Sequence, residues 1–267
     1  MTIINGESDA RLAVTAAKAG AAVVRDLYGG RLARYEKTAG DFATEADLAA
    51  ERAILDVLGA ARPDDAVTGE EGGSTGSAEA RRRWLVDPLC GTLNYAVRSM
   101  LVGVNVALRV DGETTAAATA DPFSGEVFWT DGTRARLSAE HGDEELVPSA
   151  ACALVDVNLD PPFVNASGFR AALLLADPDF AEWFRPRVIS STLALAWVAA
   201  GRRAAYVTDG DMRDSVHFTA GIALCQAAGC TVTGLDGEPV YTGSSGLIAA
   251  ADPGTHAALL AMIKRQA

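Results

Sequence analysis

The most informative stretch of the chain runs from Trp84 to Tyr95 and reads WLVDPLCGTLNY. Its apolar start, Trp84–Val86, is typical of a buried strand. The strand ends at Asp87, a proline and a Gly-Thr turn, where the chain changes direction and backbone N–H groups can face an anion. A carboxylate beside such a turn is what a metal-assisted phosphoryl site requires, because the metal must contact both a protein oxygen and a phosphate oxygen. Cys90 departs from this pattern, because a thiol is a poor ligand for a hard cation.

Composition limits the classes of partner that the chain can have. It has 267 residues, 49% of them hydrophobic, and a formal net charge of −12, which opposes binding to nucleic acid or to an anionic membrane. The segment from Met1 to Gly6 lacks the basic and apolar regions of a signal peptide, and no apolar run has membrane-spanning length. The four cysteines contain no Cys-x-x-Cys pair. We therefore expect a cytoplasmic protein with no nucleic-acid or membrane partner.

Helical spacing predicts two helices in the N-terminal part of the chain, over residues 7–28 and 45–58. Thr44 is a plausible N-cap for the second helix. Helices and antiparallel strands occur in separate runs along the chain, which indicates an α+β fold rather than a regular doubly wound sheet.

Turn signals predict two hairpins. Residues 102–110 and 113–119 flank Asp111-Gly112, which favours a tight turn between antiparallel strands. Near the end of the chain, residues 232–235 and 239–241 flank a second Asp-Gly pair and suggest another hairpin.

Four motifs of the chain resemble those of the inositol monophosphatase family. The family patterns are Asp-x-x-Thr-x-Ala-Asp, Gly-Glu-Glu, Trp-x-Val-Asp-Pro-Leu/Ile-Asp-Gly-Thr-x-Asn-Phe and Trp-Asp-x-Ala-Ala-Gly. The matching segments here are, in order, Asp41–Asp47, Gly69–Glu71, Trp84–Tyr95 and Val216–Gly221 with the trailing Ala227–Gly229. Their order and spacing hold, and they span most of the chain.

The resemblance implies a layered αβαβα sandwich with an N-terminal half, residues 1–145, that carries the metal and phosphate motifs. A C-terminal half, residues 146–267, would complete the site. The implied activity is metal-dependent hydrolysis of a small phosphate monoester, such as a sugar or cyclitol phosphate. The implied partner is that small phosphorylated substrate, and a homodimer is possible because family members are often dimers.

The resemblance also implies roles for individual residues. Glu70, Asp87 and the carbonyl of Leu89 would hold a first Mg²⁺ ion. Glu70 and Thr92 would orient the attacking water, and Asp47 would support a further, weaker metal.

Phosphate and substrate contacts follow in the same way. The N–H groups of Cys90, Gly91 and Thr92 would receive phosphate oxygens. Ser190 lies in the segment that matches a substrate-binding part of the family pattern, and the acidic loop around residue 211 offers further candidates for a polyol hydroxyl. The substrate-binding candidates are Ser190, Asp211 and Asp214.

The second metal of the family is held by three aspartates, at the positions of Asp87, Cys90 and His217. Two of these three are replaced here, and both replacements affect the same ion. Thiolate, imidazole and carboxylate together suit Zn²⁺ or Fe²⁺ better than Mg²⁺. The second site could therefore hold a softer metal, with Asp87, Cys90 and His217 as ligands.

Other interpretations stay open. The second ion could be lost while the first Mg²⁺ alone supports hydrolysis. The protein could instead bind a phosphorylated ligand without hydrolysing it, or use Cys90 as a nucleophile with His217 as its base. Cys90 could also be only a small buried side chain, with His217 hydrogen-bonded to Asp87 or Asp214.

Overall fold

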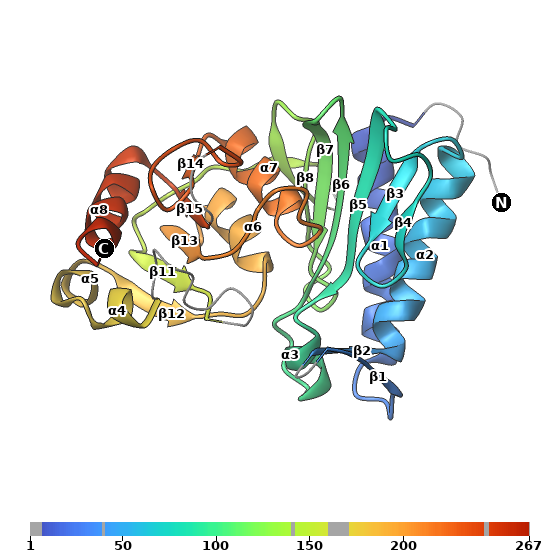
Figure 1. The fold of residues 1–267 in the computed structure, drawn as a ribbon, viewed down its shortest axis with the longest axis horizontal. Helices are drawn as coiled ribbons and strands as arrows, with labels where there is room; N and C mark the ends of the chain where they lie inside the picture. Colours follow the sequence, from blue (N-terminus) through green and yellow to red (C-terminus); the bar gives the residue numbers. More distant parts are fainter. Residues whose placement is uncertain (1–6, 39–40, 140–141, 160–170, 243–245, 267) are drawn as a thin grey trace.

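Five layers of secondary structure stack along the long axis of the molecule (Figure 1). The structure is a computed structural model, and it describes residues 7–38, 41–139, 142–159, 171–242 and 246–266. From one end to the other the layers are a helix pair, a sheet of eight strands, a second helix pair, a sheet of five strands and a group of three helices. This is the α+β sandwich of αβαβα order that the sequence predicted.

The eight-stranded sheet has the strand order β10-β9-β8-β7-β6-β5-β3-β4. All of its neighbouring pairs are antiparallel except β3 and β5, which run parallel. Its strands are β3 (Ala66–Gly69), β4 (Gly73–Thr75), β5 (Arg82–Cys90), β6 (Gly103–Val110), β7 (Glu113–Ala120), β8 (Val127–Thr130), β9 (Ala135–Ser138) and β10 (Glu144–Glu145).

The outer face of this sheet is covered by two helices, α1 (Asp9–Leu27) and α2 (Glu45–Ala61). Trp84 and Val86 of β5 pack against them, whereas Leu85, which alternates with these two residues, packs on the opposite face. Because side chains alternate along a strand, Asp87 lies on the same face as Leu85. The alternation thus turns Asp87 toward the middle of the molecule.

The middle layer consists of α6 (Leu193–Ala199) and α7 (Thr219–Ala228). Both are almost entirely apolar, as expected for helices that lie between two sheets. Ala220 and Ala223 of α7 contact Leu85 of the eight-stranded sheet, and Leu195 of α6 belongs to the same core as Tyr206 of the other sheet.

The five-stranded sheet has the order β12-β11-β13-β15-β14, and three helices cover its outer face. Its strands are β11 (Leu154–Val157), β12 (Arg185–Val188), β13 (Ala205–Thr208), β14 (Thr231–Thr233) and β15 (Leu247–Ala250). The outer helices are α4 (Ala171–Ala176), α5 (Pro178–Trp183) and α8 (Pro253–Lys264). No helix within the described ranges is both long and apolar enough to cross a membrane.

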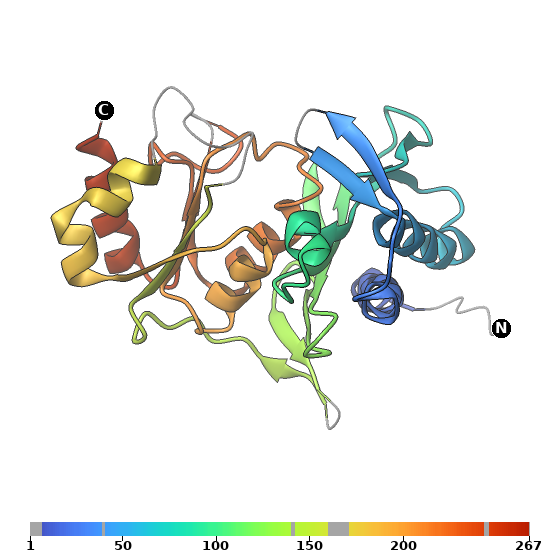
Figure 2. The same ribbon diagram turned by 90° about the horizontal axis from the view of Figure 1, so that it is seen from below.

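A small hairpin and a short helix lie together beyond one end of the strands of the eight-stranded sheet (Figures 1 and 2). The hairpin pairs β1 (Arg34–Thr38) with β2 (Asp41–Thr44), and the helix is α3 (Thr92–Ala96), which follows β5 directly.

Local signals in the sequence predicted the first hairpin correctly but not the second. β6 and β7 are joined at Asp111-Gly112, and both turn residues have positive φ, as a tight hairpin turn requires. The hairpin expected between residues 232–235 and 239–241 is wrong: β14 pairs with β15, and only one isolated bridge, Thr233 to Pro239, joins the expected partners. The partner strand is an alanine-rich segment with weak strand propensity.

The expected division near residues 140–150 falls between the two sheets. The eight-stranded sheet ends with Glu145 and the five-stranded sheet begins at Leu154. Phe128 and Ala135 of the first sheet share a core with α6 and α7, so the two halves are packed against each other. A division into domains 1–145 and 146–267 stays a prediction.

Asp156, on β11, is a buried acid in the five-stranded sheet. Its Oδ2 accepts a hydrogen bond of 2.8 Å from Nε of Arg203, whereas its Oδ1 is buried and has no hydrogen-bond partner among the described residues. Burial raises the pKa of Asp156 to about 6, and the nearby Arg203 only partly offsets this. The folded state therefore resists ionisation of this carboxyl group more than the unfolded chain does.

We expect Asp156→Asn to stabilise the protein relative to the natural chain progressively as the pH rises from 4 to 7. Below the ordinary aspartate pKa of 3.8 the carboxyl group is protonated in both states and carries no penalty; the penalty develops as the pH approaches about 6. From pH 4 to pH 7, the unfolding free energy of Asp156→Asn should rise by about 2–3 kcal/mol relative to that of the natural chain. Urea unfolding at four pH values measures it. Parallel pH profiles for the two proteins would show that Asp156 has no such effect.

Candidate metal and phosphate site

The parallel pairing of β3 and β5 places two carboxylates side by side. The two strands run in the same direction, with Gly69 paired to Val86, so Glu70, which directly follows β3, lies next to Asp87 of β5. The backbone N–H of Glu70 donates to the carbonyl of Val86, which fixes the register at this point. Asp87 is fully buried, and its Oδ1 accepts a hydrogen bond from the N–H of Leu89 across the turn.

His217 joins these two acids from the segment that precedes α7. Its Nδ1 lies 2.8 Å from Oδ2 of Asp87 and 4.0 Å from Oε2 of Glu70. Ligand atoms of the three side chains all lie within 4.8 Å of one another. Oε2 of Glu70 is buried without a hydrogen-bond partner in the part of the chain that the structure describes. An unsatisfied carboxylate oxygen beside two other ligand atoms fits a bound cation.

Glu70 and Asp87 carry like charges and are shielded from water, which shifts the pKa values of Glu70 and His217. Burial and the charge of Asp87 together raise the pKa of Glu70 to about 8, against the opposing effect of His217 and Lys37. Burial alone would lower the pKa of His217, but Asp87 outweighs it through its charge and hydrogen bond, so the pKa of His217 rises to about 9. The group thus favours positive charge at its centre.

Lys37 of the β1–β2 hairpin also reaches the acids. Its Nζ lies 2.9 Å from Oε1 of Glu70 and 2.6 Å from Oε1 of Glu71. No sequence pattern predicted the contact of Lys37 with Glu70 and Glu71, because it depends on how the β1–β2 hairpin packs next to the end of β3. Glu51 of α2 was missed as well: it is buried and accepts hydrogen bonds from the N–H groups of Glu71 and Gly72. Its position four residues after Asp47, on the buried face of α2, was a signal for it.

A chain of hydrogen bonds links Thr92 to α2. The hydroxyl of Thr92 lies 2.8 Å from Oδ1 of Asp47 and 3.2 Å from the carbonyl of Leu89. Oδ2 of Asp47 accepts from both the N–H and the hydroxyl of Thr44, the N-cap that the sequence predicted. Asp47 therefore acts as a capping-box residue and holds the Thr92 hydroxyl at the same time.

The structure does not bring Cys90 into the group of Glu70, Asp87 and His217. Its sulfur accepts hydrogen bonds from the N–H and the hydroxyl of Thr192, at 3.3 and 2.9 Å. Asn105 and Thr119 extend this buried chain across β6 and β7. Burial raises the pKa of the Cys90 thiol well above its ordinary value, and the charge of Asp87 adds to this. A protonated, buried thiol is a poor nucleophile, which opposes the covalent interpretation.

Gly91 forms the turn between β5 and α3. Its φ of +102° lies in the left-handed region, which favours glycine. A Cβ atom at this position would come within 2.9 Å of the carbonyl oxygen of Leu101. Within the described ranges, the N–H groups of Gly91 and Thr92 have no hydrogen-bond acceptor. These donors are available to an anion.

The three substrate-binding candidates differ in their contacts: Ser190 lies next to the turn at Gly91, whereas Asp211 and Asp214 are exposed and pair with arginines or their own loop. Ser190 is hydrogen-bonded to Asn94, two residues after Thr92, and so stays next to the turn. Asp211 is exposed and accepts from the N–H of Arg213. Asp214 is exposed and forms an ion pair with Arg109.

Comparisons with known proteins identify relatives of this chain. A sequence model described as the inositol monophosphatase family matches residues 6–267. An inositol-1-monophosphatase of Mycobacterium leprae (strain TN) is 32% identical over 244 residues, which cover 89% of this chain and 83% of the relative. A glucose-1-phosphate thymidylyltransferase of Streptomyces griseus is 37% identical over 139 residues, but these cover only 52% of this chain and 54% of that relative.

A solved structure supports the fold over nearly the full length. The extragenic suppressor protein suhB from Bartonella henselae superposes with a TM-score of 0.82 at 26% sequence identity. The superposition covers 95% of this chain and 97% of that chain.

We expect Gly91→Ala to lower the unfolding free energy by at least about 1 kcal/mol more than Gly125→Ala does. Both glycines have positive φ, so both variants share the backbone strain. Only at Gly91 does the new methyl group meet a backbone oxygen, whereas nothing lies within 4 Å of a Cβ at Gly125. Urea unfolding of the two variants measures the difference. Equal destabilisation would contradict the tight turn at Gly91.

Proposed function

The chain belongs to the inositol monophosphatase family, and on this premise we propose that it hydrolyses a small phosphate monoester, such as a sugar or cyclitol phosphate, with a bound divalent cation. The single observation that carries the proposal is the meeting of Glu70, Asp87 and His217 beside the turn at Gly91. A cation and a phosphate group need adjacent sites, and this arrangement offers both.

The residues present fit a divalent cation. Two carboxylates and an imidazole nitrogen are common ligands in catalytic metal sites, and the free Oε2 of Glu70 needs a partner. The carbonyl of Leu89 is a further candidate ligand. When bound, a divalent cation supplies Lewis-acid polarisation of a phosphate oxygen and lowers the pKa of a coordinated water.

The protein's own residues would position the water and the phosphate. Thr92 donates its only hydroxyl proton toward Asp47 or the carbonyl of Leu89, so its oxygen can accept a hydrogen bond from a water. Glu70 would accept a proton from the same water. The N–H groups of Gly91 and Thr92, together with that of Cys90, would receive the phosphate oxygens.

Metal identity depends on His217. An imidazole ligand favours Zn²⁺, Mn²⁺ or Fe²⁺ over Mg²⁺, which prefers oxygen ligands. We propose Mg²⁺ as the family's ion and a transition metal as the alternative, now with Glu70 rather than Cys90 as the third ligand.

Three further proposals concern the substrate contacts, the oligomeric state and the cellular location of the protein. Ser190, Asp211 and Asp214 are proposed to contact substrate hydroxyls, with Ser190 nearest in contacts to the turn at Gly91. A homodimer and a cytoplasmic location stay proposals.

A second candidate function is binding of a phosphorylated ligand without hydrolysis. One observation favours it: Lys37 and His217 already compensate the charges of Glu70 and Asp87 without any metal. The solved relative from Bartonella henselae is named an extragenic suppressor protein rather than a phosphatase. Activity therefore has to be measured.

We expect the purified protein to release phosphate from at least one sugar or cyclitol phosphate in the presence of Mg²⁺, Mn²⁺ or Zn²⁺. Asp87→Asn should reduce this release by about 100-fold or more, because a carboxylate at the strand end is lost. Asp111→Asn, at an exposed turn, is the matched control and should leave the rate unchanged. No release with any of the three ions, or release that survives Asp87→Asn, contradicts the proposal.

The variant His217→Asp should shift metal preference toward Mg²⁺. We expect Mg²⁺ to bind about tenfold more tightly, and Zn²⁺ about tenfold more weakly, than in the natural chain, because a hard oxygen replaces the nitrogen ligand. Isothermal titration calorimetry measures both affinities. His217→Asn is the control, since it removes the nitrogen ligand without adding a carboxylate. If the ratio of the Zn²⁺ affinity to the Mg²⁺ affinity is the same in His217→Asp as in the natural chain, His217 does not bind the ion.

A further inference from the structure

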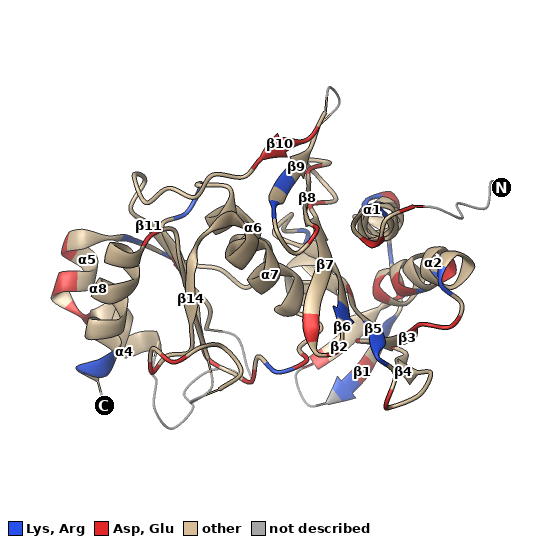
Figure 3. Ribbon diagram, turned by 90° about the horizontal axis from the view of Figure 1, so that it is seen from above, with Lys and Arg blue, Asp and Glu red and all other residues tan. Residues whose placement is uncertain are grey.

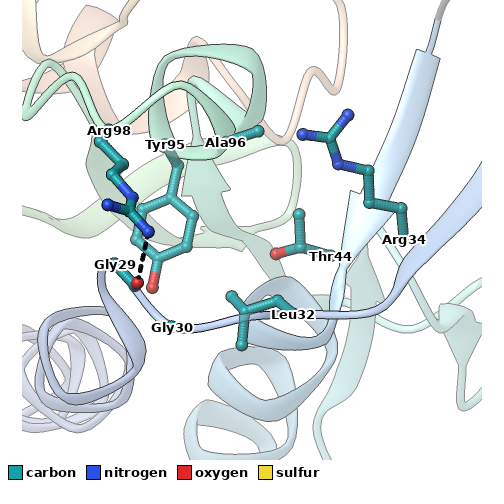
Figure 4. Close-up of a pocket in the computed structure, with 8 residues that line it drawn as sticks. All are labelled: Gly29, Gly30, Leu32, Arg34, Thr44, Tyr95, Ala96 and Arg98. Carbon is teal, nitrogen blue, oxygen red and sulfur yellow. Dashed lines mark hydrogen bonds between the residues drawn. The ribbon is translucent and has the colours of Figure 1, made fainter.

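A pocket lies between the end of α1, the β1–β2 hairpin and α3, with arginines on two of its sides (Figure 4). Arg98 stands at one side and Arg34 at the other, with Leu32 and Thr44 between them. The pocket has a volume of about 70 Å³, and its lining contains none of Glu70, Asp87 and His217.

Its lining is unusual for this chain. Asp and Glu outnumber Lys and Arg by 35 to 23, yet no acidic residue lines the pocket. Figure 3 shows that the β1–β2 hairpin carries both basic and acidic residues. Among the described residues, neither Arg34 nor Arg98 has a carboxylate partner within ion-pair distance. Two guanidinium groups without counter-charges leave the pocket positive.

Arg98 is held in place from several directions. Its φ of +64° is left-handed, a strained conformation for a residue with a side chain. Its N–H donates to the carbonyl of Tyr95, its own carbonyl accepts from the hydroxyl of Tyr28, and its Nη2 donates to the carbonyl of Gly29 at 2.9 Å. These bonds fix the guanidinium group at the rim before any ligand arrives.

Arg34 approaches from the opposite side. Its guanidinium carbon lies 4.8 Å from the centre of the Phe42 ring, which supports the side chain along the hairpin. In Figure 4 its guanidinium group points back across the pocket toward Ala96. The remaining N–H groups of both arginines are thus available to a ligand between them.

We propose that this pocket binds a small tetrahedral oxyanion of the phosphate class between Arg34 and Arg98. One water molecule needs a cavity volume of about 10–15 Å³, so the volume of about 70 Å³ in this pocket holds roughly five to seven heavy atoms. Orthophosphate has five heavy atoms and therefore fits this volume. Guanidinium groups match phosphate oxygens in pairs, and two of them favour a dianion over a singly charged carboxylate.

The bound anion would connect two elements that carry the candidate site. Arg34 is three residues before Lys37, and Arg98 follows α3, which begins with Thr92. Thr44 in the pocket wall is hydrogen-bonded to Asp47, which holds the Thr92 hydroxyl. The proposal itself does not rest on the proposed function, because a binder and a hydrolase would share this pocket.

Nuclear magnetic resonance of the full chain tests the proposal in a buffer with a metal chelator and constant ionic strength. Orthophosphate is titrated, and sulfate, glycerol phosphate, acetate and chloride serve as comparison ligands. The reporters are the amides of Gly29 and Gly30 and the Nε–H groups of Arg34 and Arg98. The amides of Gly91 and Thr92 report separately on the candidate active site, so failure of one site is distinguishable from failure of the other.

We expect saturable shifts of the pocket reporters with orthophosphate and sulfate, and none with acetate or chloride. A weaker response to glycerol phosphate would identify free phosphate as the ligand, and a stronger one a phosphate ester. Arg34→Gln should weaken binding about tenfold, as should Arg98→Gln, because each removes a charge-assisted hydrogen bond. Arg52→Gln, at an exposed arginine of α2, is the control.

Three results would overturn the proposal. They are pocket reporters that stay still up to about 20 mM phosphate, shifts of equal size with acetate or chloride, and shifts that survive Arg34→Gln. Among the described residues, the side chain of Arg34 makes no hydrogen bond, so we expect Arg34→Gln to fold. This variant therefore tests the proposal even if Arg98→Gln unfolds.

Discussion

The repulsion between Glu70 and Asp87 is the constraint on which the site depends. The parallel pairing of β3 with β5 brings these two acids together, with Asp87 fully buried and Glu70 largely buried. Two like charges in such a position need positive charge nearby, and the raised pKa of Glu70 expresses that need. The surrounding structure supplies positive charge from three directions: His217 before α7, Lys37 on the hairpin and the free N–H groups at the turn. A metal ion would be a fourth source and would compete with the proton on His217.

This competition links the two candidate functions. Lys37 bonds Oε1 of Glu70 and leaves Oε2 free, so a cation can enter without displacing the lysine. His217 must give up the proton on its Nδ1 before that nitrogen can bind a metal, because metal ligands are deprotonated. With its pKa near 9, the imidazole holds that proton firmly at neutral pH. The same four side chains can thus form either a metal centre or a charge-balanced, metal-free pocket, and the balance depends on pH and on which ion is present.

Most of the fold could be predicted from the sequence because the strongest signals act between residues that are close together in the chain. The capping residue Thr44 and the Asp111-Gly112 turn each act within a few residues, and the structure has both as predicted. The pairing of β14 with β15 was missed because β15 is alanine-rich and gives only a weak strand signal. At the candidate site, the contacts that were missed join elements far apart in the chain. Lys37 and Thr192 were not assigned to their partners, Glu70 and Cys90, since both contacts depend on how distant elements fold together. The sequence therefore identified Glu70, Asp87 and His217 at the centre but not the contacts that Lys37 and Thr192 make.

The central claim is that Glu70, Asp87 and His217 form one cation site at the end of β5. Anomalous diffraction from a crystal soaked in Mn²⁺ tests it most directly. The account predicts a peak about 2.0–2.3 Å from a carboxylate oxygen of Glu70, an oxygen of Asp87 and Nδ1 of His217. A manganese peak bound to the Cys90 sulfur instead, or no peak among these three side chains at saturating Mn²⁺, would contradict it.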